Sequence, residues 1–129
     1  MKKLLLLTLL CFSINGFAVN WKKLFEDKFK DTYVDIDNIK KRNGLVYYWS
    51  LVDTLEPVVD SYGRVTYSNI SKVKVDCVEE KLTMLNMIFY SQSMGKGKIV
   101  QDAPQTKTFY PIPGTSPYVH MKYACKNAK

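Results

Sequence analysis

The sequence predicts an α+β fold that is mainly β, with an antiparallel sheet followed by one C-terminal helix. Three observations lead to this class. Apolar and polar residues alternate along several segments, as they do on strands with one buried face. Turn signals rich in glycine, proline and asparagine separate these segments. Beyond residue 115 the apolar spacing changes to three and four residues, which is typical of a short amphipathic helix.

The N-terminal part of this predicted domain contains one ambiguous segment and one strand. Residues 21–26 fit either element, because Trp21 and Phe25 would share a face of a helix or of a strand. Residues 32–37 alternate and contain β-branched side chains, so they predict a strand.

A hairpin signal precedes the most strongly predicted strand. Asn43 and Gly44 tolerate the positive φ of a tight turn. Residues 45–53 then form a strand with apolar side chains on both faces, which indicates a central or covered position. Residues 55–63 predict a loop, because they contain Pro57 and a glycine.

The next long strand is predicted over residues 65–77, with one buried and one solvated face. Val73 and Val75 share one face, and Lys72 and Lys74 share the other. This alternation is typical of an antiparallel sheet with one wet side. The valine face is therefore expected to meet the core.

Three further strands complete the predicted sheet. Residues 81–90 form a strand in which the alternation changes near Met84, which indicates a β-bulge. A flexible basic turn over residues 93–98 follows, and residues 98–101 and 106–110 predict short final strands.

The C-terminal helix is predicted to begin at Ser116. A serine N-cap followed by Pro117 at the first helical position is a helix start signal. The apolar face of this helix consists of Tyr118, Met121, Ala124 and Cys125. We expect this face to pack on the sheet.

Residues 1–18 read as an export signal. A charged start precedes an apolar run over residues 4–14, and Gly16 and Ala18 form a small-x-small cleavage site. A stable membrane span would need ~20 apolar residues, so this run predicts a cleaved signal instead. The mature protein would be a single domain over residues 19–129 that is periplasmic or secreted.

Cleavage leaves two of the three cysteines. Cys77 and Cys125 would pair in an oxidising compartment and would tie the helix to the sheet. Lipidation at Cys11, which would display the protein on the surface, is the alternative. It needs a small residue just before the cysteine, and Leu10 is bulky, so no convincing lipobox is present.

The charge balance favours anionic partners. The chain carries 19 basic and 12 acidic residues, and removal of the signal lowers the net charge from +7 to +5. Such an excess suits lipopolysaccharide, acidic glycans or acidic protein patches, although it is also ordinary for solubility. The lysines are scattered and the protein is exported, so we predict no nucleic-acid partner.

The residues predict no catalytic, cofactor or metal site. A metal centre needs a cluster of ligands, and the chain has one histidine and no Ca²⁺-loop spacing. Ser116 precedes His120 by four residues, but no nucleophile elbow accompanies the pair. We therefore interpret His120 as a surface or helix-packing residue. A small enzyme that uses His120 or a carboxylate pair is the alternative.

A binding surface is predicted on the wet face of the sheet, opposite the helix. It would carry Lys72 and Lys74, with Lys96 and Lys98 from the basic turn added to it. The alternative interpretation of residues 95–98 is a simple hairpin turn that contacts no partner.

The order of these features resembles the bacterial surface-adhesin protein E family over residues 21–125. The residues that carry the resemblance are Trp21; Tyr33, Asp35 and Ile39; Trp49, Leu51 and Asp53; Lys72 to Asp76 and Cys77; Tyr90, Gly95 and Gly97; Pro113, Gly114 and Ser116; and Cys125. The resemblance implies a six-stranded antiparallel sheet with a helix tied to it by the cysteines. It also implies that residues 21–26 are a strand.

The resemblance also suggests a function. The family is named for members that bind host extracellular-matrix and serum proteins and can dimerise. We therefore expect a non-enzymatic exported protein that binds a protein or envelope component. The alternatives are an inhibitor of an extracellular hydrolase such as lysozyme, and a small structural envelope protein.

Overall fold

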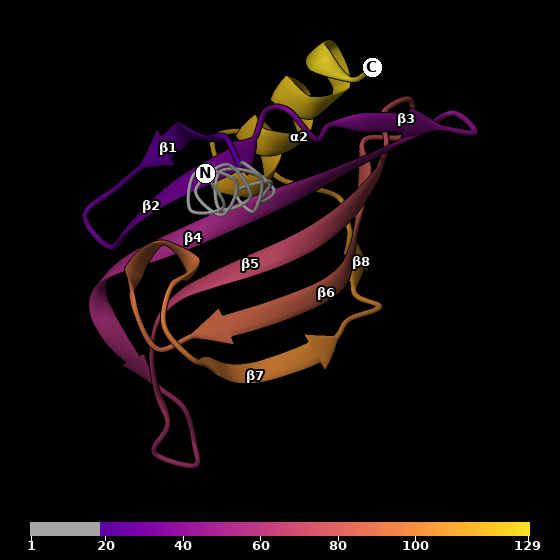
Figure 1. Ribbon diagram of the computed structural model, residues 1–129. Coiled ribbons are helices and arrows are strands. Elements are labelled where there is room, and N and C mark those ends of the chain that lie inside the picture. Colours follow the sequence, from indigo (N-terminus) through magenta and orange to yellow (C-terminus); the bar gives the residue numbers. More distant parts are fainter. Residues whose placement is uncertain (1–18) are drawn as a thin grey trace, which may run out of the picture.

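The computed structural model describes residues 19–129. The predicted export signal, its predicted cleavage site and Cys11 lie outside the described residues. The chain forms an antiparallel sheet and a C-terminal helix (Figure 1). The elements are β1 (Trp21–Glu26), β2 (Lys30–Asp35), β3 (Lys40–Arg42), β4 (Leu45–Val59), β5 (Val65–Asp76), β6 (Lys81–Tyr90), the 3₁₀ turn η2 (Ser93–Gly95), β7 (Ile99–Pro104), β8 (Thr108–Phe109) and α2 (Ser116–Asn127).

The sheet is a meander with two short additions. Its strands lie in the order β1-β2-β4-β5-β6-β7, while β3 pairs with β4 and β8 pairs with β6. Every pairing is antiparallel. The expected fold class is confirmed, with six strands along the main path, and the ambiguous residues 21–26 form a strand.

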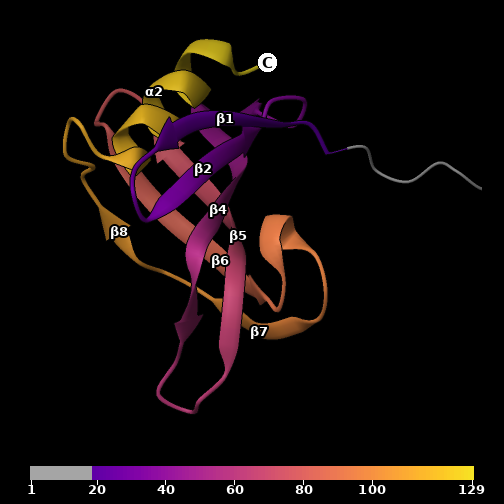
Figure 2. The same cartoon turned by 90° about the vertical axis from the view of Figure 1, so that its left-hand side faces the viewer.

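The helix lies on one side of the sheet and closes the hydrophobic core there (Figure 2). It packs mainly on β1, β2 and β4. The buried apolar side chains of this core are Val34, Ile39, Val46, Tyr48, Val73, Val75, Leu82, Met121 and Ala124. Val73 and Val75 thus face the helix, as the alternation predicts.

A disulfide joins the two layers. Cys77, which directly follows β5, is bonded to Cys125 of α2. The predicted pairing is therefore confirmed, and the bridge closes a loop with a sequence separation of 48 residues.

The predicted loop over residues 55–63 is wrong in its first half. Strand β4 continues to Val59 and pairs with the start of β5. Pro57 is accommodated because the pairing is irregular between Asp53 and Val58, so no regular ladder bond is lost there. The backbone N–H of Leu55 instead donates to the carbonyl of Phe29 at 3.0 Å.

The turn at Asn43-Gly44 and the bulge in β6 are confirmed. Asn43 and Gly44 both have positive φ, and the turn joins β4 to a strand that was not predicted, β3. In β6 the register shifts so that Leu85 is the extra residue between the partners of Lys72 and Val73. This bulge moves the side chains beyond it to the other face of the sheet.

The predicted N-cap at Ser116 is wrong by one residue. Thr115 is the N-cap, and Pro117 occupies the first turn of α2. The Ser116 hydroxyl is not free to cap the helix, because it donates to the Thr32 hydroxyl at 3.1 Å inside the protein. This contact fixes the start of the helix against β2.

Candidate binding surface

The sheet face opposite α2, called the open face below, combines aromatic and basic side chains. Cross-strand pairing places Trp49 of β4 beside Lys72 of β5, and Tyr47 beside Lys74. These side chains alternate with the core residues, so they point away from the helix. The structure thus puts Lys72 and Lys74 on the face that the sequence predicts for them.

Lys72 and Trp49 contact each other directly. The Lys72 ammonium lies 5.6 Å from the centre of the Trp49 ring, which is a cation–π geometry. Such contacts contribute ~0.5–1 kcal/mol at exposed sites. Both side chains are half-buried, so the lysine stem lies along the sheet while its charge remains available to a partner.

An aromatic groove crosses the middle of the open face. Trp21, Trp49 and Tyr90 line it together with Ile70 and Ile88, and its volume is about 330 Å³. Ile70 pairs with Ile88 across β5 and β6, so the groove floor comes from adjacent strands. Aromatic side chains of this kind supply large contact areas in binding sites.

A second hollow of about 330 Å³ lies beside the groove and is basic. Lys40 and Arg42 of β3 line it together with Tyr47, Trp49 and Lys72. The two β3 residues were not among the predicted surface residues, because the sequence predicts no strand before the turn. The Asn43-Gly44 turn carried the necessary signal, since a hairpin there places Lys40 opposite Tyr47.

The connection between β6 and β7 covers the other end of the open face. Its backbone is anchored there, because the N–H of Met94 donates to Asp53 at 3.1 Å and that of Gly95 donates to the Ser68 hydroxyl at 2.8 Å. A Cβ at Gly95 would lie 2.7 Å from Ile70 Cδ1, so glycine permits this close approach. The connection thus joins the antiparallel strands β6 and β7 as the expected hairpin turn, and it also packs on the sheet.

Lys96 and Lys98 are exposed beyond this anchored connection. The four predicted lysines therefore do not form one cluster. Lys72 and Lys74 lie at the end of the open face near β3, and the other two lie at the end near η2. The aromatic groove separates the two basic groups.

Two acidic side chains on the open face, Asp35 and Asp53, are engaged within the protein. Asp35 accepts a hydrogen bond from the Asn38 amide at 2.6 Å, and Asp53 accepts one from the Met94 backbone. By contrast, among residues 19–129 no ion pair involves Lys72 or Lys74. The open face therefore presents unpaired positive charge.

His120 and Ser116 do not form a nucleophile–base pair. His120 Nε2 lies 2.7 Å from the Thr32 hydroxyl, and Ser116 donates to that same hydroxyl. Burial and the nearby Lys30 ammonium lower the pKa of His120 to about 4. His120 is thus a buried packing residue on the helix, and its bond to Thr32 joins α2 to β2.

Residues 19–129 hold no group of three His, Cys, Asp or Glu side chains placed to ligate a metal ion. No helix in the same part of the chain combines the length and apolar character of a membrane span.

The fold and the open face together define a small disulfide-bonded sheet protein with one helix-covered side and one basic, aromatic side. The family model described as surface-adhesin protein E matches residues 21–126. The chain therefore belongs to the surface-adhesin protein E family.

Solved structures of protein E from Haemophilus influenzae share this fold. One is 20% identical in sequence with a TM-score of 0.67, and the alignment covers 87% of this chain and 88% of that one. A second crystal form is 19% identical with a TM-score of 0.69, and the alignment covers 87% and 91% of the two chains. No curated protein sequence gives a match.

Proposed function

We propose that this protein is an exported, non-enzymatic adhesin that binds an acidic region of a partner protein through the open face. The observation that carries the proposal is the unpaired basic group of Lys40, Arg42, Lys72 and Lys74 beside the aromatic groove. Opposite charges steer the encounter of two proteins, and desolvated aromatic side chains hold the complex.

The disulfide supports the exported location. Disulfides persist in the periplasm and outside the cell, and they are rare in the cytosol. The Cys77–Cys125 bridge fits a protein that acts in such an oxidising compartment. Family membership supports the adhesive role and a partner among host matrix proteins.

Charge reversal at the centre of the open face should weaken partner binding. For the double variant Lys72→Glu/Lys74→Glu we expect affinity for immobilised host extracellular-matrix proteins to fall about tenfold or more, mainly through slower association. The wild-type association rate should also fall as salt rises. Biolayer interferometry at two salt concentrations measures both effects.

The matched control reverses two charges on the other side of the molecule. Lys107 and Lys126 are exposed, so Lys107→Glu/Lys126→Glu changes the net charge equally and should leave affinity near the wild-type value. Equal loss in both double variants would mean that only net charge matters, which would contradict a site on the open face. Binding that disappears after removal of glycans from the matrix would assign the site to acidic glycans instead.

A further inference from the structure

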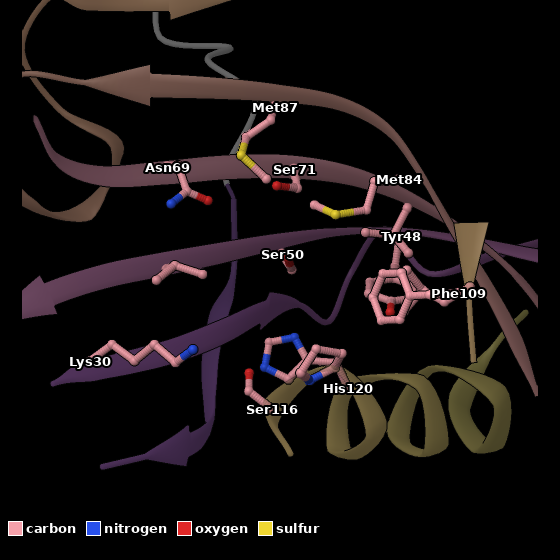
Figure 3. Close-up of a pocket in the computed structure, with 14 residues that line it drawn as sticks. Lys30, Tyr48, Ser50, Asn69, Ser71, Met84, Met87, Phe109, Ser116 and His120 are labelled. Atoms are coloured by element: carbon pink, nitrogen blue, oxygen red, sulfur yellow. The ribbon is translucent and has the colours of Figure 1, made fainter. Parts of the chain in front are cut away.

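A separate hollow of about 270 Å³ lies on the helix-covered side of the sheet, beneath the first turn of α2 (Figure 3). It exists because α2 packs mainly on β1, β2 and β4. The adjoining surface of β5 and β6 is therefore only partly covered, and β8 closes the hollow at one end.

Small and polar side chains form the floor of this hollow. Ser50 of β4 lies opposite Ser71 of β5 in the strand register, and Val52 lies opposite Asn69. Tyr48 and Val73, the next pair along the same face, are buried in the core. The serine pair thus leaves space at a position where larger apolar side chains would fill the interior.

The polar groups of the hollow are available to a ligand. In the described part of the chain, no hydrogen bond or ion pair engages the side chains of Lys30, Ser50, Asn69 or Ser71. Ser71 is buried, whereas Lys30, Ser50 and Asn69 are half-buried. Four polar groups that converge on one concave and partly apolar site are typical of a binding pocket.

The electrostatics of the hollow select an anion. Among residues 19–129, Lys30 is the one cationic side chain that lines it, and no carboxylate does. His120, which also lines it, is neutral near pH 7, because burial and Lys30 lower its pKa to about 4. Its Nε2 is already engaged with Thr32. The lining therefore carries a net positive charge, which is located on the Lys30 ammonium.

The opposite end of the hollow is apolar. Figure 3 shows Lys30 and Asn69 at one end, and Met84 and Phe109 at the other. Leu82 adds to the apolar end, and the flexible methionine side chain can adapt to a bound chain. The hollow is therefore amphipathic along its length.

We propose that this hollow binds a medium-chain monocarboxylate, with the carboxylate at Lys30 and the alkyl chain against Met84 and Phe109. Its size fits such a ligand. A cavity of ~150 Å³ holds benzene, with six carbon atoms. In proportion, the 270 Å³ here holds about ten non-hydrogen atoms, as in octanoate. This site lies on the other side of the sheet from the open face and does not depend on the adhesive function.

Titration of the ¹⁵N-labelled protein with octanoate tests the proposal. We expect saturable shifts confined to amides around Lys30, Ser71 and His120. From butanoate to octanoate the affinity should rise about fourfold for each added CH₂, and it should level off beyond the length that fills the hollow. Shifts that do not saturate, or affinities that do not depend on chain length, would overturn the proposal.

Two variants locate the headgroup and the chain. Lys30→Met keeps the alkyl stem and removes the charge, so octanoate should bind about tenfold or more weakly while 1-octanol binding is unchanged. Lys28→Met, an exposed neighbour outside the hollow, is the matched control and should bind both as the wild type does. Equal effects of the two lysine variants would contradict the assignment.

A second position keeps the test decisive if Lys30→Met does not fold. Ser71→Leu fills the floor and should abolish binding of both octanoate and 1-octanol, whereas binding of matrix proteins by the open face should persist. Unchanged octanoate binding by a folded Ser71→Leu protein would place the ligand elsewhere. The matrix-binding measurement also separates failure of this proposal from failure of the adhesive function.

Discussion

Removal of the Cys77–Cys125 bridge should lower the free energy of unfolding by roughly 4 kcal/mol. The double variant Cys77→Ala/Cys125→Ala is the suitable change, because it leaves no free thiol among residues 19–129. The chain-entropy model gives about this value for a closed loop of the length found here. Small domains have a total stability of only ~5–15 kcal/mol. The loss should appear as a lower urea midpoint at 25 °C.

Hydrogen exchange should show where this loss acts first. The helix is held at its end by the bridge, while the central strands are held by pairing on both sides. Removal of the bridge should therefore raise the exchange rates of amides in α2 more than those of amides in β4 and β5. Val78→Ala, an exposed neighbour of the bridge, serves as the control. A variant with wild-type stability would contradict the role given to the disulfide.

Acidification should destabilise the protein through its single histidine. Burial and Lys30 lower the pKa of His120 in the folded protein from 6.5 to about 4. Between these values the unfolded chain binds a proton that the folded protein does not. This contribution to stability is therefore complete above pH 6.5 and is lost as the pH falls towards 4. The loss amounts to roughly 3 kcal/mol.

The variant His120→Gln isolates this effect. Glutamine can still bond the Thr32 hydroxyl but does not titrate. The free energy of unfolding of the variant should fall less between pH 7 and pH 4 than that of the wild type, by roughly 3 kcal/mol. The remaining fall, common to both proteins, comes from carboxylates. Parallel pH profiles for the two proteins, measured by urea unfolding, would show that His120 does not titrate as the structure implies.

Local signals were sufficient to predict much of the fold. The alternation of residues 65–77 assigned Val73 to the core and Lys72 to the open face, and the pairing confirms both assignments. The Asn-Gly turn, the bulge in β6 and the disulfide also follow from short-range patterns or from cysteine number. The turn and the bulge depend on residues close in sequence. The disulfide is the single pairing that Cys77 and Cys125 allow.

The wrong predictions arise where a contact with another segment decides the local structure. The hydroxyl of Ser116 bonds Thr32, 84 residues earlier, and so it does not cap the helix. Strand β4 continues past Pro57 because β5 is long enough to pair with its end. Strand β3 is three charged residues, whose strand character comes entirely from the neighbouring β4.

The placement of the four candidate lysines was predicted only in part. Period-two alternation identifies the face on which a lysine lies, but it does not tell which strands are neighbours. The groove of Trp21, Trp49 and Tyr90 requires the register of several strands. The separation of Lys72 from Lys96 requires the anchored turn at Gly95.

A lysine footprint of the bound protein tests the proposed binding role of the open face most directly. The protein is acetylated free and in complex with matrix proteins, and each lysine is quantified by mass spectrometry. We expect protection of Lys40, Lys72 and Lys74, with Lys107 and Lys126 modified equally in both states. Protection of Lys107 and Lys126 with no change at Lys72 and Lys74 would contradict the account.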